Sequence, residues 1–295
     1  MTTTFDQQME QIAAGERLPV DEIRRLAASP DVLPLGMLAD TLRRRLHGTR
    51  ATYVRVSSCQ YDHSFTEAVQ PAAQEIRITG APESIAVAVT AVETARRLAG
   101  ERTVAGFSWT DVERLAAGAD VAGVLETLRH AGLDALGEIP LDETADLPGS
   151  LRALQGAGFE RVRLSVSRLA AAERTALLLR AGQLQDEFGI VESLDPLPAS
   201  VSTFRPTTGY EDVKMVAIAR LAAPAVPSIQ VDWRRYGPKL AQVALTVGAD
   251  DIDAVSPSDH SSQGPRRAPL EEVRRNIRAA GLEPVERDGR FDLLA

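Results

Sequence analysis

Eight short runs of strand-forming residues recur along this chain, and helical patterns separate them. The runs are Thr52–Ser57, Gln74–Thr79, Arg102–Phe107, Leu133–Leu136, Arg161–Val166, Ile190–Leu194, Ile229–Trp233 and Asp251–Val255. The helical patterns place apolar residues at i, i+3, i+4 and i+7, and several of them end at a glycine, which tolerates the left-handed geometry that closes a helix. Those glycines are Gly100, Gly132, Gly158, Gly189 and Gly248. Consecutive βα units build a parallel sheet and eight parallel strands close a barrel, so the sequence predicts the α/β class and a (βα)8 TIM barrel.

Helical segments flank this barrel at both ends. One helix opens at Leu18–Glu22 and is expected to break at Pro30 and Pro34. Another runs from Pro269 to Ala280, with proline in its first turn and Gly281 just past its end. No stretch has the composition of a linker. We therefore expect a single domain over residues 1–295, with a helical N-terminal extension (1–50), the barrel (51–256) and a C-terminal helical extension (257–295).

Composition and charge limit the classes of partner. The chain has 295 residues, of which 44% are hydrophobic and 25% charged, which is enough for one large barrel. Its net charge of -8 disfavours a nucleic-acid partner. No apolar run approaches the roughly 20 residues of a membrane helix, and residues 1–16 show no secretory leader. We expect a cytoplasmic protein that binds neither nucleic acid nor a membrane.

Residues 209–255 carry a series of motifs that identifies a family. The series reads GYEDVKMVAIARL from Gly209, PSIQVDW from Pro227, GPKLAQVAL from Gly237 and GADDID from Gly248. Weaker matches are LAD from Leu38, RLHG from Arg45, AGLD from Ala131, LQDE from Leu184 and PVERD from Pro284. The series resembles the C-terminal half of aminofutalosine synthase, dehypoxanthine futalosine cyclase and the related deazaflavin-cofactor synthase subunit. The resemblance implies the radical S-adenosylmethionine family of the menaquinone (futalosine) pathway, and a TIM barrel of the radical-SAM type.

Cys59, just after the first predicted strand, is the one cysteine of the chain. In the relatives, a C-x-x-x-C-x-x-C loop at this place holds a four-iron cluster on three thiolates. The sequence therefore predicts no iron–sulfur cluster and disfavours S-adenosylmethionine, so that no cofactor is expected. Gly80, after the second strand, matches a glycine-rich turn near that cofactor and is the cofactor-binding candidate; the alternative is a plain strand-to-helix turn. Cys59 is either a reactive thiol or a small buried residue that packs like alanine.

Polar residues gather where the predicted strands end, which is where TIM barrels hold their active sites. After the seventh and eighth strands the resemblance implies a small-molecule pocket formed by Gln230, Asp232, Trp233, Arg234 and Asp253. Ser108 and Glu138 complete the predicted substrate-binding set from the third and fourth strand ends. Trp233 offers a stacking face for a nucleoside-like ligand, or else packs beneath the rim.

His63, His260 and Asp232 are the candidate catalytic acid, base and orienting group. Asp62–His63 and Asp259–His260 follow the first and eighth strands, which are neighbours in a closed barrel. Two histidines and two carboxylates can also hold zinc or iron, but their spacing is no known signature, and we predict no metal site. Nucleophile elbows, phosphate loops and dinucleotide fingerprints are absent from the sequence.

Two hypotheses for the function follow from these residues. In the first, the chain is a cluster-free accessory protein or pseudoenzyme that binds a nucleoside-like molecule, or another menaquinone-pathway enzyme, without radical chemistry. In the second, the barrel mouth performs acid–base chemistry as a lyase, isomerase or hydrolase on a futalosine-type nucleoside or an aromatic acid. An enzyme should show a titratable residue with a perturbed pKa in a water-poor pocket.

Overall fold

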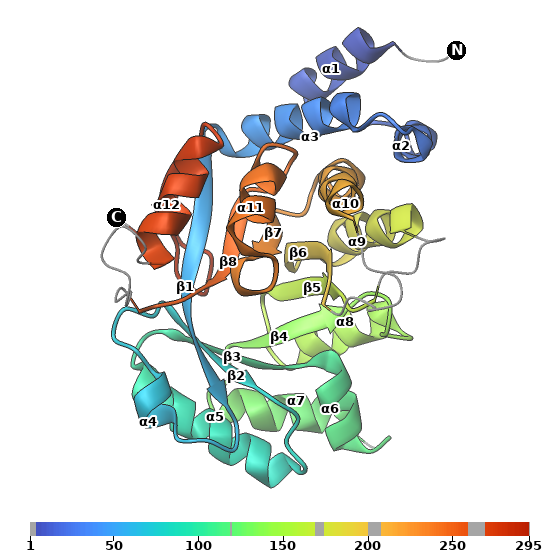
Figure 1. Ribbon diagram of the computed structural model, residues 1–295. Helices are drawn as coiled ribbons and strands as arrows, with labels where there is room; N and C mark the ends of the chain where they lie inside the picture. The colour runs from blue at the N-terminus through green and yellow to red at the C-terminus, as the bar shows by residue number, and fades with distance from the viewer. Residues whose placement is uncertain (1–3, 119, 169–173, 200–207, 259–268, 295) are drawn as a thin grey trace.

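The computed structural model describes residues 4–118, 120–168, 174–199, 208–258 and 269–294 (Figure 1). Its strands are β1 (Arg50–Gln60), β2 (Glu75–Thr79), β3 (Thr103–Ser108), β4 (Ala135–Pro140), β5 (Val162–Val166), β6 (Val191–Pro198), β7 (Ser228–Asp232), β8 (Asp251–Val255) and β9 (Glu283–Glu286). Neighbouring strands pair in parallel from β2 through β8 to β1, and β1 pairs with β2 to close the ring. The prediction of an eight-stranded parallel barrel is confirmed.

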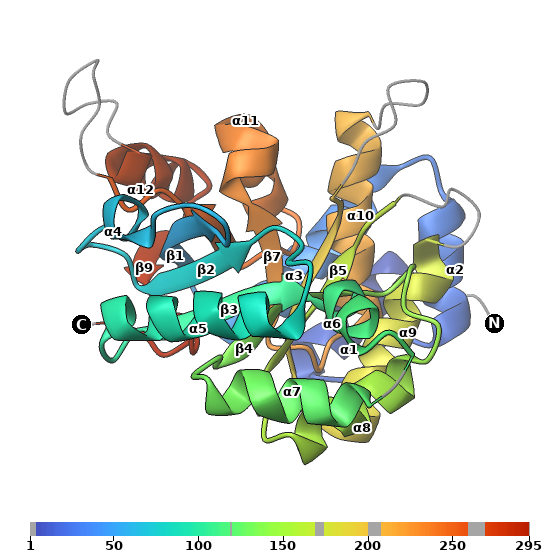
Figure 2. The same cartoon turned by 90° about the horizontal axis from the view of Figure 1, so that it is seen from below.

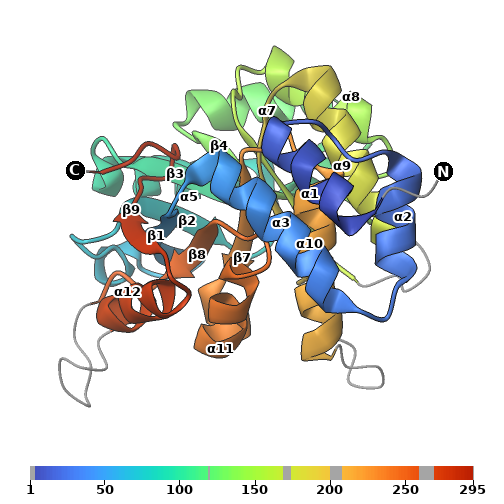
Figure 3. The same cartoon turned by 90° about the horizontal axis from the view of Figure 1, so that it is seen from above.

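Helices surround the barrel and precede it. They are α1 (Phe5–Ala14), α2 (Val20–Ala28), α3 (Val32–His47), α4 (Phe65–Ala68), α5 (Ile85–Ala99), α6 (Trp109–Ala116), α7 (Val121–His130), α8 (Leu147–Gly156), α9 (Arg174–Phe188), α10 (Gly209–Ala222), α11 (Trp233–Leu245) and α12 (Pro269–Ala279). Figure 2 shows α5, α6 and α7 along the outside of β2, β3 and β4. Figure 3 shows α3 lying across α10, so the N-terminal helices extend the outer layer. None of the helices in the described ranges combines the length and apolar composition that a membrane crossing needs.

The apolar core lies between the strands and these helices. Ile76 of β2, Val104 of β3 and Leu125 of α7 are fully buried members of it. The five predicted helix-ending glycines all have positive φ, between 60° and 119°, as the helix–glycine–strand order requires. The division of the chain into one domain with two extensions stays a prediction.

Two local expectations are wrong for identifiable reasons. Pro34 does not break a helix, because it stands in the first turn of α3, where backbone N–H groups have no intrahelical partner. Asp31 caps that turn by accepting a hydrogen bond from the Leu33 N–H at 3.0 Å. The fourth strand begins at Ala135 rather than Leu133, because the Leu133 N–H closes α7 by donating to the Leu128 carbonyl.

β9 is a strand that the β-rich runs do not predict. Thr52 and Tyr53 of β1 pair with β8 and also with β9, so these two strands lie on opposite edges of β1. β1 pairs with β2 through residues 56–60 and with β9 through residues 50–53. β9 therefore fills the seam between β1 and β2 at the N-terminal end of the barrel, and it brings Arg287 to the barrel axis.

Candidate functional site

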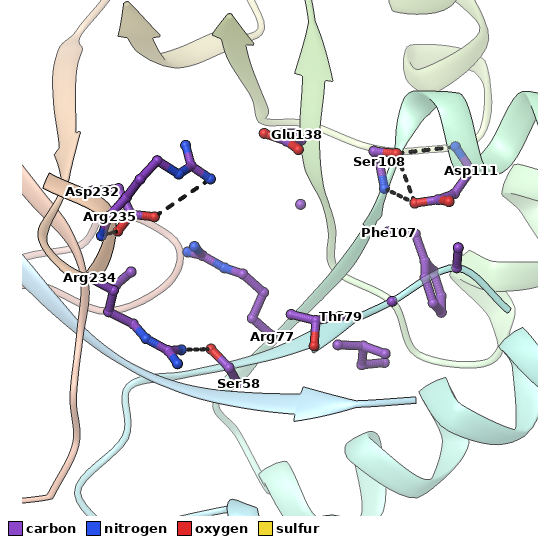
Figure 4. Close-up of a pocket in the computed structure, with 15 residues that line it drawn as sticks. Ser58, Arg77, Thr79, Phe107, Ser108, Asp111, Glu138, Asp232, Arg234 and Arg235 are labelled. Carbon is purple, nitrogen blue, oxygen red and sulfur yellow. Dashed lines mark hydrogen bonds and ion pairs between the residues drawn. The ribbon is translucent and has the colours of Figure 1, made fainter. Parts of the chain in front are cut away.

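A polar pocket of about 670 Å³ opens at the C-terminal ends of the strands (Figure 4). Its lining comes from β1, β2, β3, β4, β7, β8 and the turns that follow them: Ser58, Arg77, Ile78, Thr79, Gly80, Ala81, Phe107, Ser108, Asp111, Gly137, Glu138, Asp232, Arg234, Arg235 and Ala254. This volume falls within the range of small-molecule sites. The pocket lies where the barrel fold places active sites.

Arg77 of β2 forms the floor of the pocket. Its guanidinium binds both carboxylate oxygens of Asp253, at 2.8 and 2.9 Å, and Oε1 of Glu75 at 2.8 Å. Burial alone would raise the pKa of Asp253, but the Arg77 guanidinium outweighs it and holds that pKa well below its usual range. Asp253 and Glu75 therefore neutralise the Arg77 guanidinium. Arg77 forms the rigid floor of the pocket and is not a free cation for a ligand.

Below Arg77 a charged network fills the barrel. Arg163 of β5 binds both oxygens of Glu75 at 2.8 and 2.6 Å, and Arg287 binds both oxygens of Asp251 at 2.7 Å. Burial would raise the pKa of Glu75, but the neighbouring arginines lower it to about 2. Three arginines and three carboxylates thus balance inside the barrel, which leaves the rim as the region open to a ligand.

Two predicted substrate-binding residues belong to this network. The Gln230 amide donates to Asp251 at 2.6 Å, and Asp253 holds Arg77. Trp233, the third predicted contact, is only 9% exposed in the first turn of α11 and is absent from the pocket lining, which favours the packing interpretation. The ligand-binding roles of these residues stay predictions.

Two guanidinium groups project from the β7 side of the rim. Arg234 is exposed and donates to the Ser58 hydroxyl at 2.7 Å, and within the described ranges it has no ion pair. Arg235 lies between Asp195 and Asp232, at 3.8 and 3.9 Å, which is too long for a hydrogen bond to either carboxylate. Asp232 itself caps α11 by accepting from the Arg235 N–H at 2.9 Å. Both guanidinium groups are therefore available to an anionic ligand.

The β3 and β4 side of the rim carries carboxylates. Glu138 is half-buried and has no hydrogen-bond or ion-pair partner among the described residues. Figure 4 shows its carboxylate at the opening, across from Arg234 and Arg235. Ser108 caps α6 and forms a capping box with Asp111, with the two side chains 2.8 Å apart. Glu138 is therefore the uncommitted acid of the pocket.

The backbone of the rim is unusual at three positions. Gly80 has φ of 92°, and a Cβ there would lie 2.4 Å from the Gln60 amide, so the turn requires glycine. Phe107 and Ala254 adopt left-handed φ values of 58° and 57°. Such conformations are rare in residues other than glycine, and they concentrate at ligand sites. Both residues line the pocket.

The predicted catalytic residues do not all meet in this pocket. Asp232 lines it, but His63 is 75% exposed and lines a separate groove with Tyr61 and Phe65 against α5. His260 lies outside the described residues. Their catalytic roles stay predictions. Across the described part of the chain, no group of three or more histidine, cysteine, aspartate or glutamate side chains could hold a metal ion.

Asp195 of β6 is a candidate that the sequence analysis does not single out. Its side chain is 16% exposed, and Oδ1 accepts from the Leu197 N–H at 3.0 Å. Burial raises the pKa of Asp195 to about 8, because Arg235 is too distant to offset the loss of hydration. A carboxyl with such a pKa beside an open pocket is the kind of group expected of an active site. No sequence motif marks Asp195.

Comparisons with known proteins identify the relatives of this chain. Residues 196–295 match the family model described as the CofH/MqnC C-terminal region. The chain is 27% identical to 5-amino-6-(D-ribitylamino)uracil--L-tyrosine 4-hydroxyphenyl transferase of Archaeoglobus fulgidus, over 87% of this chain and 92% of that protein. It is 25% identical to aminodeoxyfutalosine synthase of Thermus thermophilus, over 96% of this chain and 94% of that protein. The chain is a homologue of the futalosine-pathway radical SAM enzymes.

Solved structures agree on the fold of this futalosine-pathway homologue. Methylornithine synthase superposes with a TM-score of 0.67 at 14% identity, covering 94% of this chain and 97% of that chain. The FeFe-hydrogenase maturase of Carboxydothermus hydrogenoformans superposes with a TM-score of 0.66 at 14% identity, covering 95% and 79%. At this identity the likeness establishes the barrel architecture alone.

The expectation that this homologue uses no cofactor is wrong. Its relatives are radical SAM enzymes, which use an iron–sulfur cluster and S-adenosylmethionine, and nothing in the described residues shows the chain to be cluster-free. The similarity to these relatives therefore points to both groups rather than to none.

A four-iron cluster of this kind needs three thiolates. Cys59 is the single thiol of the sequence and is 1% exposed. Ser58 lines the pocket, so Cys59, the next residue of β1, faces away from it. Burial raises the pKa of the Cys59 thiol to about 11. A cluster held by three thiolates of this one chain does not fit these residues, and we derive no chemical step through it.

Proposed function

We propose that the barrel mouth of this homologue binds a small polar molecule that carries a carboxylate together with amino or hydroxyl groups. The observation that carries this proposal is the charge arrangement of the pocket. Glu138 offers an uncommitted carboxylate on one side, and Arg234 offers a guanidinium without an ion pair, among the described residues, on the other. A zwitterionic or carboxylate-bearing ligand can satisfy both sides at once.

The printed names of the relatives support this chemical class. One relative is named for 5-amino-6-(D-ribitylamino)uracil and L-tyrosine, which combine a heterocycle with a hydroxylated chain and an amino acid. Another is named for aminodeoxyfutalosine, the product of a synthase. We assign the chain to the same biosynthetic chemistry, with a nucleoside-like compound or an aromatic amino acid as its ligand. Glu138 would accept from an ammonium or hydroxyl group while Arg234 binds the carboxylate.

Isothermal titration calorimetry with three probes tests the proposal: 5-amino-6-(D-ribitylamino)uracil, L-tyrosine and aminodeoxyfutalosine. We expect at least one probe to bind, and we expect Glu138→Gln and Arg234→Met each to weaken that probe by at least tenfold. Glu93→Gln and Arg97→Met remove the same side chains from exposed positions on α5 and are the matched controls. If no probe binds, or if the controls weaken binding equally, the proposal is wrong.

An acid–base enzyme at the same mouth is the second candidate. The perturbed carboxyl of Asp195 beside Arg235 favours it. Incubation of the protein with a bound probe, followed by mass spectrometry of the probe, would reveal a conversion. An association with another menaquinone-pathway enzyme, and the absence of nucleic-acid and membrane partners, remain proposals from the sequence.

A further inference from the structure

We propose that Asp195 is a ligand-binding carboxylic acid: together with Arg235 it donates a hydrogen bond to the anionic group of the ligand, and it does so only while it carries its proton. This inference rests on the proposed function, and it adds Arg235 and Asp195 to Arg234 as the groups that hold the ligand's carboxylate. It adds a residue that is not part of the pocket lining, and it makes the affinity depend on pH.

Arg235 lies at the pocket without a close ion pair among the described residues. Its guanidinium lies 3.8 Å from Asp195 and 3.9 Å from Asp232, and its side chain is 34% exposed at the pocket. Neither contact is a hydrogen bond. A carboxylate entering from the pocket can therefore bind Arg235 without first breaking a well-formed ion pair. The anion then lies beside Asp195 as well.

The pairing of β5 with β6 places a second polar side chain, Ser165, beside Asp195. Asp195 of β6 pairs in register with Ser165 of β5. Ser165 lies two residues past Arg163, whose guanidinium points into the barrel, so Ser165 faces the interior as well. Ser165 is 5% exposed, and its buried hydroxyl has no hydrogen-bond partner among the described residues. Among the same residues, Oδ2 of Asp195 also has no hydrogen bond. Two neighbouring polar groups, the Ser165 hydroxyl and Asp195 Oδ2, can therefore each bind a ligand atom.

The charged groups around Asp195 determine its protonation. Arg235 faces it from α11, Asp232 from the end of β7 and Asp253 from β8, where Arg77 neutralises Asp253. Tyr236 of α11 also approaches, with its hydroxyl donating to the Pro198 carbonyl. Burial is the main reason that the pKa of Asp195 rises to about 8, and the two acidic neighbours add to it. At neutral pH the carboxyl is therefore mainly neutral and can donate a hydrogen bond.

The charge of Asp195 determines how the affinity for the ligand's carboxylate changes with pH. Protonated Asp195 donates to the ligand's carboxylate, whereas ionised Asp195 repels it and competes for Arg235. Affinity is therefore constant below the pKa and falls as the pH rises above it. With a pKa of about 8, binding should weaken about tenfold between pH 7 and pH 9.

A titration with 3-(4-hydroxyphenyl)propanoate tests this, because its carboxylate stays ionised throughout that range and it has no amine. We expect the wild type to show the tenfold loss. Asp195→Asn keeps a donor and cannot ionise, so its affinity should be the same at pH 7 and pH 9. Asp195→Leu removes the donor and should bind at least tenfold more weakly at pH 7. Glu93→Gln, on the outer surface, should retain the wild-type pH dependence.

A second measurement needs no ligand. Carbon-13 NMR of carboxyl-labelled aspartate, with Asp195→Asn to assign the signal, reports the protonation of Asp195 directly. A midpoint near pH 8 supports the inference, and a midpoint below pH 6 overturns it. Binding that does not change with pH in the wild type also overturns it while leaving the proposed function intact. A lack of binding by every probe, combined with a midpoint near pH 8, overturns both the ligand site and the donor role.

Discussion

Arg287→Met should be among the most destabilising single substitutions in this protein. Arg287 is 1% exposed and binds both oxygens of Asp251, which is itself fully buried. It also lies 3.9 Å above the Phe291 ring. Methionine preserves much of the apolar stem but, among the residues that the structure describes, leaves the Asp251 charge with Gln230 and Thr52 as its side-chain partners. Removing one partner of a buried pair costs about 3–5 kcal/mol, so we expect a loss of that size in the free energy of unfolding.

A double-mutant cycle measured by urea unfolding tests this reasoning. Asp251→Asn removes the stranded charge, so the double variant with Arg287→Met should be more stable than Arg287→Met alone. Arg17→Met is the control, because Arg17 makes a similar two-bonded pair with Asp186 at the surface, where such pairs contribute about 1 kcal/mol or less. If Arg287→Met loses less than about 1 kcal/mol, or if the two substitutions add without coupling, the Arg287–Asp251 pair does not stabilise the barrel as described.

Three further predictions concern Glu75, Gly289 and Cys59. The folded-state pKa of Glu75 is about 2, below its ordinary value of 4.5, so ionised Glu75 stabilises the fold above pH 4.5 and this stabilisation should be lost as the pH falls towards 2. If Glu75→Gln unfolds in acid at the same pH as the wild type, this prediction is wrong. A Cβ at Gly289 would lie 2.6 Å from Cβ of Thr103, so Gly289→Ala should cost about 1–3 kcal/mol in thermal unfolding, and an unchanged melting temperature would be the contrary result. Cys59 is buried with a pKa of about 11, so iodoacetamide at pH 8 should modify it only after denaturation, as mass spectrometry would show.

Local pattern was sufficient to predict the barrel. Five of the βα units have a helix followed by a glycine, at Gly100, Gly132, Gly158, Gly189 and Gly248, and this repetition holds even where one boundary is displaced by two residues, as at Leu133. β9 escaped prediction because its four residues include Pro284 and two glutamates, and it forms only by pairing with β1. Its stability comes from a contact between distant parts of the chain, which periodicity does not record.

The site was predictable only in part. Asp232, Arg234 and Glu138 lie at or just past the ends of predicted strands and line the pocket, and their substrate-binding and catalytic roles stay predictions. Asp195 was not predictable, because its raised pKa comes from burial and from the 3.8 Å distance to the Arg235 guanidinium. Arg77 lies within β2. In the sequence a single charged residue in a strand suggests a solvent-facing side chain, because its partner Asp253 lies on another strand.

The triple pairing of β1 has a kinetic consequence. Residues 50–53 pair with β8 and β9, which are the last strands along the chain, so these contacts join segments roughly two hundred positions or more apart in sequence. Contacts of such separation carry the largest loop-closure entropy and tend to form slowly. We expect β1 to remain unpaired on one edge for most of the folding reaction. A strand of another molecule can pair with that edge during refolding and lead to aggregation. We therefore expect the refolding yield to depend more strongly on protein concentration than the native stability does.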